Sequence, residues 1–97
     1  MRLNNFQTKI DSIVSKRKIF IKGFSPDGVK LSHNLNRSVS DNEINSIRVH
    51  KYLTDTKYVG KVETARYLDK IGLDEKTTLK QLKAEEIQLI LEWFNLK

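Results

Sequence analysis

The stretch from Lys18 to Leu35 restricts the fold most, because its side chains alternate in character on both sides of a strong turn signal. In KIFIKGFSPDGVKLSHNL, apolar residues recur at every second position around Ser25-Pro26-Asp27-Gly28. Successive side chains of a strand point to opposite faces, while proline and glycine favour the central and closing positions of a tight turn. The sequence therefore predicts a β-hairpin over residues 18–35.

The two faces of this predicted hairpin differ in chemistry. Ile19 and Ile21 share an apolar row with alternate residues of the second strand, from Val29 to Leu35. The opposite face carries two aromatic and three basic side chains, namely Lys18, Phe20, Lys22, Phe24 and Lys30. Aromatic rings that stack on bases, set among lysines that contact phosphates, are typical of surfaces that bind unpaired nucleic acid.

Helical periodicity predicts most of the remaining fold. An apolar stripe indicates an N-terminal helix that ends near residues 16–18, and a second helix runs from Lys61 to Ile71 and stops at Gly72. A strongly apolar helix ends the chain, and residues 44–53 fit either a short helix or a third strand. We expect an α+β fold in which residues 1–97 form one small domain. It would contain an N-terminal helix, a β-hairpin or three-stranded antiparallel sheet, and two to three C-terminal helices.

Charge is distributed unevenly along the chain. Residues 1–61 hold 12 basic and 5 acidic side chains, whereas residues 62–97 hold 6 and 7. Clustered lysine and arginine favour binding to a polyanion, although a surplus of lysine is also common in proteins from AT-rich genomes. The excess favours nucleic acid as the partner of the N-terminal part, through the hairpin face together with Arg17, Arg48 and Lys51.

Two further surfaces are candidates for binding. Basic residues alternate with Tyr52 and Tyr58 in a second string, which consists of Arg48, Lys51, Lys57 and Lys61. In the C-terminal helix, Leu89, Trp93 and Leu96 form a second apolar row beside the main one. That row either completes the core or contacts a protein, including a second copy of this chain in a homodimer.

No motif indicates catalysis or a cofactor. The chain has no cysteine and two histidines, and it lacks the glycine-rich phosphate loops and the nucleophile and metal motifs of common enzyme classes. Neither His33 nor His50 stands in a cluster with metal-ligand spacing, so no metal is expected. The longest apolar run, Leu89 to Leu91, is too short to span a membrane, and no signal peptide is evident at the N-terminus, so a cytoplasmic protein is expected.

These observations favour a non-enzymatic nucleic-acid-binding module. The alternative is a small regulatory or inhibitory factor, encoded by a cell or a virus, that docks on a larger nucleic-acid-handling protein. Exposure of Phe20 and Phe24 would favour nucleic-acid binding, and burial of both would favour the protein-binding alternative.

Overall fold

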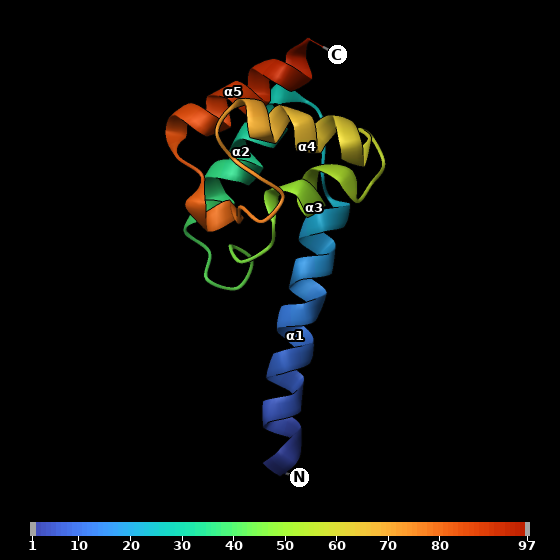
Figure 1. Cartoon of the computed structure of the whole chain (residues 1–97). Helices are drawn as coiled ribbons and strands as arrows, with labels where there is room; N and C mark the ends of the chain where they lie inside the picture. The colour runs from blue at the N-terminus through green and yellow to red at the C-terminus, as the bar shows by residue number, and fades with distance from the viewer. Residues whose placement is uncertain (1, 97) are drawn as a thin grey trace.

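Most of the chain that the structure describes is helical. The computed structural model describes residues 2–96, with the side chains of residues 12–96, and contains no β-strand in that range. The elements are α1 (Arg2–Lys22), α2 (Gly28–Val39), α3 (Val49–Thr54), α4 (Lys61–Lys70), the 3₁₀ turn η1 (Leu79–Gln81) and α5 (Ala84–Asn95). Helices α2 to α5 gather into one body, from which α1 projects (Figure 1). The predicted α+β class is therefore wrong.

The predicted β-hairpin is wrong because residues 18–22 complete α1 and residues 28–39 form α2. Leu31 and Leu35 are four positions apart, a spacing that places them on one face of either a strand or a helix. The other two members of the alternating row distinguish these cases. Val29 and His33 are exposed on α2, whereas Leu31 and Leu35 are completely buried. The alternating row thus consists of two residues on the buried face of a helix and two exposed residues between them.

The segment Ser25-Pro26-Asp27-Gly28 reverses the chain, but it does so as the start of α2. The Asp27 carboxylate accepts a hydrogen bond of 3.1 Å from the Lys30 amide, and Ser25 Oγ accepts one of 3.2 Å from the Asp27 amide. An aspartate in this position caps a helix by satisfying an amide that has no partner within the helix. The sequence therefore predicts a chain reversal at the correct place, but the reversal is a helix start and not the predicted hairpin turn.

Replacing Asp27 by alanine is expected to lower the free energy of unfolding by about 1 kcal/mol, because the Lys30 amide loses its acceptor. Asparagine at the same position keeps a side-chain oxygen and should change stability by only a few tenths of a kcal/mol. Urea unfolding followed by circular dichroism compares the two variants. Equal stability of the two variants would contradict the capping role.

The core lies between α2, α3, α4 and α5. Helix α2 packs against α5 and η1, and α3 packs against α4. Residues that are fully buried come from each of these elements and from the loop before α3, and include Leu31, Leu35, Ile44, Tyr52, Leu53, Leu68, Leu79 and Ile90. Within residues 44–53, a helix is present only from Val49 onwards, as α3; the residues before it form turns, so the predicted helical part around Ile44 and Ile47 is wrong. The alternative third strand is absent from the described chain.

Gly72 ends the segment that carries α4, as its position in the sequence predicts. Its φ of 88° is left-handed, and the Leu73 amide donates to the Leu68 carbonyl over 2.8 Å while the Gly72 amide donates to Asp69 over 3.1 Å. This pair of hydrogen bonds is the Schellman arrangement, which glycine adopts without steric penalty. The predicted helix stop is confirmed.

Candidate nucleic-acid interface

Phe20 and Phe24 belong to the aromatic part of the core. The Phe20 ring stacks on Tyr52 with 4.6 Å between centroids, and only 8% of Phe20 is exposed. Phe24 is half-buried, with its ring 5.4 Å from Tyr52 and 5.5 Å from Phe94. Burial in this cluster raises the pKa of the Tyr52 hydroxyl above its ordinary value of 10.0. The predicted face of alternating lysine and phenylalanine is therefore absent, because Phe20 is buried and Phe24 is half-buried among other rings.

Five of the predicted basic residues nevertheless come together at one place. The surface between α1 and α3 is hollowed into two adjoining clefts that share Ile21 and Lys51. We call this surface the basic cleft; its basic residues are Arg17, Lys18 and Lys22 of α1, Arg48 before α3, and Lys51 of α3. Asp55 is the one carboxylate among the lining residues, and it pairs with Lys51 over 3.4 Å. The cations of the cleft therefore outnumber its acidic groups.

The end of α1 is held in place by polar contacts with the loop before α3. The Arg17 guanidinium donates to Ser46 Oγ over 2.8 Å and to the Glu43 carbonyl over 3.4 Å. Lys16 pairs with Asp41 over 2.9 Å and with Glu43 over 2.8 Å. The hydrogen bond from Lys16 lowers the pKa of Asp41 below its ordinary value of 3.8. These contacts, together with the burial of Phe20 and Ile21, position the lysines of α1 beside α3.

The N-terminus of α4 extends the basic cleft. A third hollow shares Lys51 and Asp55 with the basic cleft and is also lined by Lys57, Lys61 and Glu75. Gly60 precedes α4 and has no side chain that could cap the helix. Free amides at a helix N-terminus carry partial positive charge and favour anions. The structure thus brings the second basic string of the sequence beside the first.

His50 has a structural contact in this region. Its Nε2 lies 2.9 Å from the Lys61 carbonyl oxygen, which makes Nε2 the donor. This hydrogen bond connects α3 to the start of α4.

Lys57, which lies before α4, has a left-handed φ of 66°, which is uncommon for a residue with a side chain. The sequence gives no local signal for this backbone geometry. The pair Gly60-Lys61, at the start of the periodic segment of α4, is the one sequence signal that could have indicated a helix start without a side-chain cap.

Lys30 lies apart from the other predicted basic residues. It is exposed on α2 and lines a separate hollow together with Gly23, Val29, His33 and Asn34. The predicted grouping of Lys30 with Lys18 and Lys22 depended on the pairing of two strands that do not exist. Lys30 is therefore not part of the basic cleft.

The apolar row of α5 is partly covered by its own domain. The Trp93 ring stacks on Tyr67 with centroids 4.5 Å apart and planes 3° apart, and the Tyr67 hydroxyl donates to the Leu89 carbonyl over 2.7 Å. Leu89 remains 38% exposed and Leu96 85% exposed. Trp93 thus joins α5 to α4, and exposed apolar surface remains at Leu96.

Replacing Trp93 by leucine is expected to remove a stacking contribution of about 0.5 to 1.5 kcal/mol to the free energy of unfolding. A double-mutant cycle with Tyr67→Leu isolates this contribution from the change in buried area. Thermal and urea unfolding of the four proteins supply the energies. Independent, additive effects of the two substitutions would contradict the stacked pair.

The described residues contain neither a cluster of metal-ligating side chains nor a membrane-spanning helix. No group of three His, Asp or Glu side chains within them could hold a metal ion. None of the described helices is both long enough and apolar enough to cross a membrane.

Comparison with models of known protein families, with curated protein sequences and with solved structures found no significant match.

Proposed function

We propose that this chain is a non-enzymatic module that binds the phosphate backbone of double-stranded nucleic acid through the basic cleft. The observation that carries the proposal is the convergence of five cationic side chains from α1, α3 and the residue before α3 on one hollowed surface. A duplex displays closely spaced phosphates, and each contact with a lysine or arginine releases condensed counterions. Contacts of this kind position a protein on nucleic acid without reading its sequence.

Duplex is the favoured form because the two phenylalanines of the predicted stacking face are withdrawn from the surface, Phe20 fully and Phe24 in part. Binding of unpaired nucleic acid relies on exposed aromatic rings that stack on successive bases. The Phe20 ring stacks on Tyr52, and the Phe24 ring meets Tyr52 edge-on and Tyr58 and Phe94 at tilted angles. A cleft with cations and no exposed phenylalanine suits backbone contact in place of base stacking.

Burial of Phe20 and partial burial of Phe24 favour the protein-binding alternative. That criterion assumed that lysines and phenylalanines share one face of a sheet. In the helical fold they are separated: the rings enter the core while Lys18, Lys22 and Lys51 remain exposed. The cations can therefore contact phosphates without help from the rings. The protein-binding alternative would instead use the exposed end of the apolar row of α5, at Leu96.

Fluorescence anisotropy with short labelled duplex DNA, duplex RNA and single-stranded DNA tests the proposal. If all five cations contact phosphates, duplex affinity should fall roughly 500-fold between about 50 and 200 mM salt, a slope of about −4.5 in log K against log salt. Single strands of equal length should bind more weakly. Absence of duplex binding at low salt, a slope near zero, or a preference for the single strand would contradict the proposal.

A further inference from the structure

Arg17 differs from the other cations of the basic cleft because the loop before α3 holds its guanidinium. Its Nη1 donates to Ser46 Oγ over 2.8 Å and to the Glu43 carbonyl over 3.4 Å. Arg17 is half-buried, whereas the other four cations of the cleft are exposed. A side chain that the fold already holds in place loses little conformational entropy when it binds a ligand.

The two contacts leave one edge of the Arg17 guanidinium available. An arginine carries five N–H donors in a planar fork, spread over Nε, Nη1 and Nη2. Both contacts of Arg17 start from Nη1, so Nε and Nη2 make no hydrogen bond with the groups that the structure describes. Together Nε and Nη2 form an edge that can donate two parallel hydrogen bonds to the oxygens of one carboxylate or phosphate. Arg17 is therefore positioned with an oxyanion-binding edge unpaired.

The hollow that Arg17 lines contains basic, hydroxyl and apolar groups and no carboxylate. Its other lining residues are Ile21, Ser46, Ile47, Arg48 and Lys51. The carboxylates of Asp41 and Glu43 lie outside this lining, and both pair with Lys16, over 2.9 and 2.8 Å. Those two carboxylates with Lys16 leave one negative charge, against three positive charges in the hollow. The hollow thus favours an anion, and no ion pair of Arg17 within the described residues has to break to admit one.

We propose that Arg17 anchors the nucleic acid by binding one backbone phosphate through two parallel hydrogen bonds from Nε and Nη2, and that Ser46 is the residue that positions its guanidinium. This inference rests on the proposed function, because it names the contact by which the basic cleft holds the duplex backbone. The lysines of the cleft act as point charges on flexible stems. The phosphate at Arg17 thus fixes where the backbone crosses the end of α1, beside α3 (Figure 1).

Arg17→Lys tests the anchor because it keeps the charge and removes the edge that donates two hydrogen bonds. Duplex affinity should fall roughly tenfold at constant salt, the loss of about one charge-assisted hydrogen bond, while the slope of log K against log salt stays the same. Arg48→Lys is the matched control, because Arg48 lines the same hollow and is exposed. It should bind duplex like the unmodified protein. Equal affinities of the two variants would overturn the proposal.

Two substitutions of Ser46 test its positioning role. Ser46→Ala removes the oxygen that accepts from Arg17 and changes no charge. Its duplex affinity should lie between those of the unmodified protein and Arg17→Lys, with the same salt slope. Ser46→Thr keeps the hydroxyl and should restore the affinity. If the alanine and threonine variants bind duplex alike, Ser46 does not position Arg17.

NMR of the Arg17 side chain separates binding from a purely structural contact. Burial of Phe20 and Ile21 holds α1 against the body without help from Arg17, so circular dichroism of Arg17→Lys should show unchanged helix content. In the unmodified protein, the nitrogen–proton signal of Arg17 Nε should shift when short duplex DNA is added, and that of Arg48 should shift much less.

The same titration distinguishes failure of the anchor from failure of the proposed function. An Arg17 Nε signal that stays in place while anisotropy shows salt-dependent duplex binding would overturn the anchor alone. Absence of duplex binding by the unmodified protein at low salt would overturn the proposed function, and the anchor with it.

Discussion

Replacement of Phe20 by alanine is expected to lower the free energy of unfolding by about 3 to 5 kcal/mol, the range for truncation of a buried phenylalanine. The loss is large because the ring fills the space between α1 and α3 and stacks on Tyr52, which is itself completely buried. The substitution leaves a cavity and removes one of the few apolar contacts that hold α1 against the body. Urea unfolding followed by circular dichroism measures the change.

Ile19→Ala is the matched control for this prediction. Ile19 is the neighbouring residue on α1 and is 71% exposed, so its truncation should change stability by no more than about 0.5 kcal/mol. The sequence interpretation assigned these two residues the reverse roles, with Ile19 in the core and Phe20 on a binding surface. Unchanged stability of the Phe20 variant combined with weakened nucleic-acid binding would restore that interpretation.

The error in this region has a specific physical origin. A period of two and a period of 3.6 both place residues four apart on one face, so Leu31 and Leu35 support a strand and a helix equally. Ile19 and Ile21 are two apart, which a strand places together and a helix separates by more than half a turn. The decision between the two periods depends on tertiary packing, because Phe20 is buried against Tyr52 of α3 whereas the neighbouring Ile19 is exposed.

Turn chemistry was the second source of error. Proline followed by aspartate and glycine is a strong reversal signal, and it is equally a helix start in which aspartate is the cap. Local sequence does not distinguish these uses unless the periodicity on both sides is known. By contrast, the stop at Gly72 was predictable because a left-handed glycine and its two hydrogen bonds form within one helix end, without help from distant residues.

The basic cleft was predictable in composition and not in shape. The excess of cations in residues 1–61 is a property of the sequence, and it identifies Arg17, Lys18, Lys22, Arg48 and Lys51 as candidates. Their assembly depends on the packing of α1 beside α3, which places residues about 30 positions apart around the same hollow. Lys30 shows the limit of the sequence argument. The incorrect strand pairing grouped it with Lys18 and Lys22, but it lies on α2, outside the basic cleft.

Removing four charges from the basic cleft should have the largest effect on binding. If the basic cleft binds phosphates as proposed, a variant with Lys18, Lys22, Arg48 and Lys51 all changed to glutamine should lose four phosphate contacts. The slope of log K against log salt should become less steep by about 3.6, and affinity for duplex at about 100 mM salt should fall roughly 1000-fold. All four side chains are exposed, and the exposed pair of Lys51 with Asp55 contributes little to stability, so the variant should fold normally.

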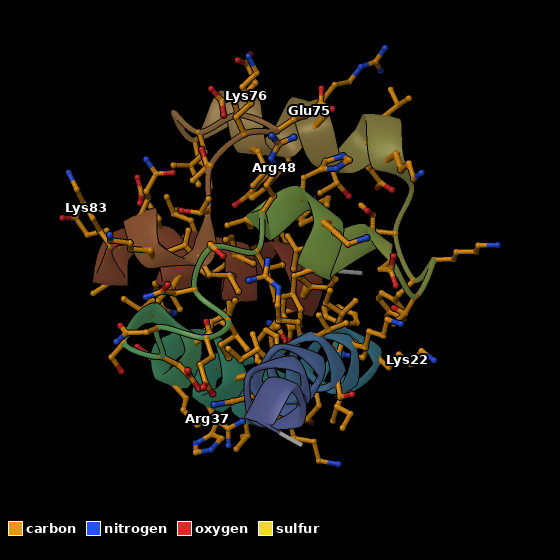
Figure 2. The ribbon with its side chains drawn as sticks, turned by 90° about the horizontal axis from the view of Figure 1, so that it is seen from below. Lys22, Arg37, Arg48, Glu75, Lys76 and Lys83 are labelled. Carbon is orange, nitrogen blue, oxygen red and sulfur yellow. The ribbon has the colours of Figure 1, made fainter. Side chains whose placement is uncertain are left out.

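The control variant must separate the location of the charges from their number. Lys30, Lys70, Lys80 and Lys83 are exposed and line none of the hollows of the basic cleft or of the α4 N-terminus. Figure 2 shows Lys83 and Lys22 extending from opposite sides of the molecule. Changing these four lysines to glutamine removes the same net charge and should weaken binding only through the long-range field, with little change in the salt slope. An equal loss of affinity and slope in the two variants would mean that net charge alone attracts the nucleic acid and that the cleft is not the binding site.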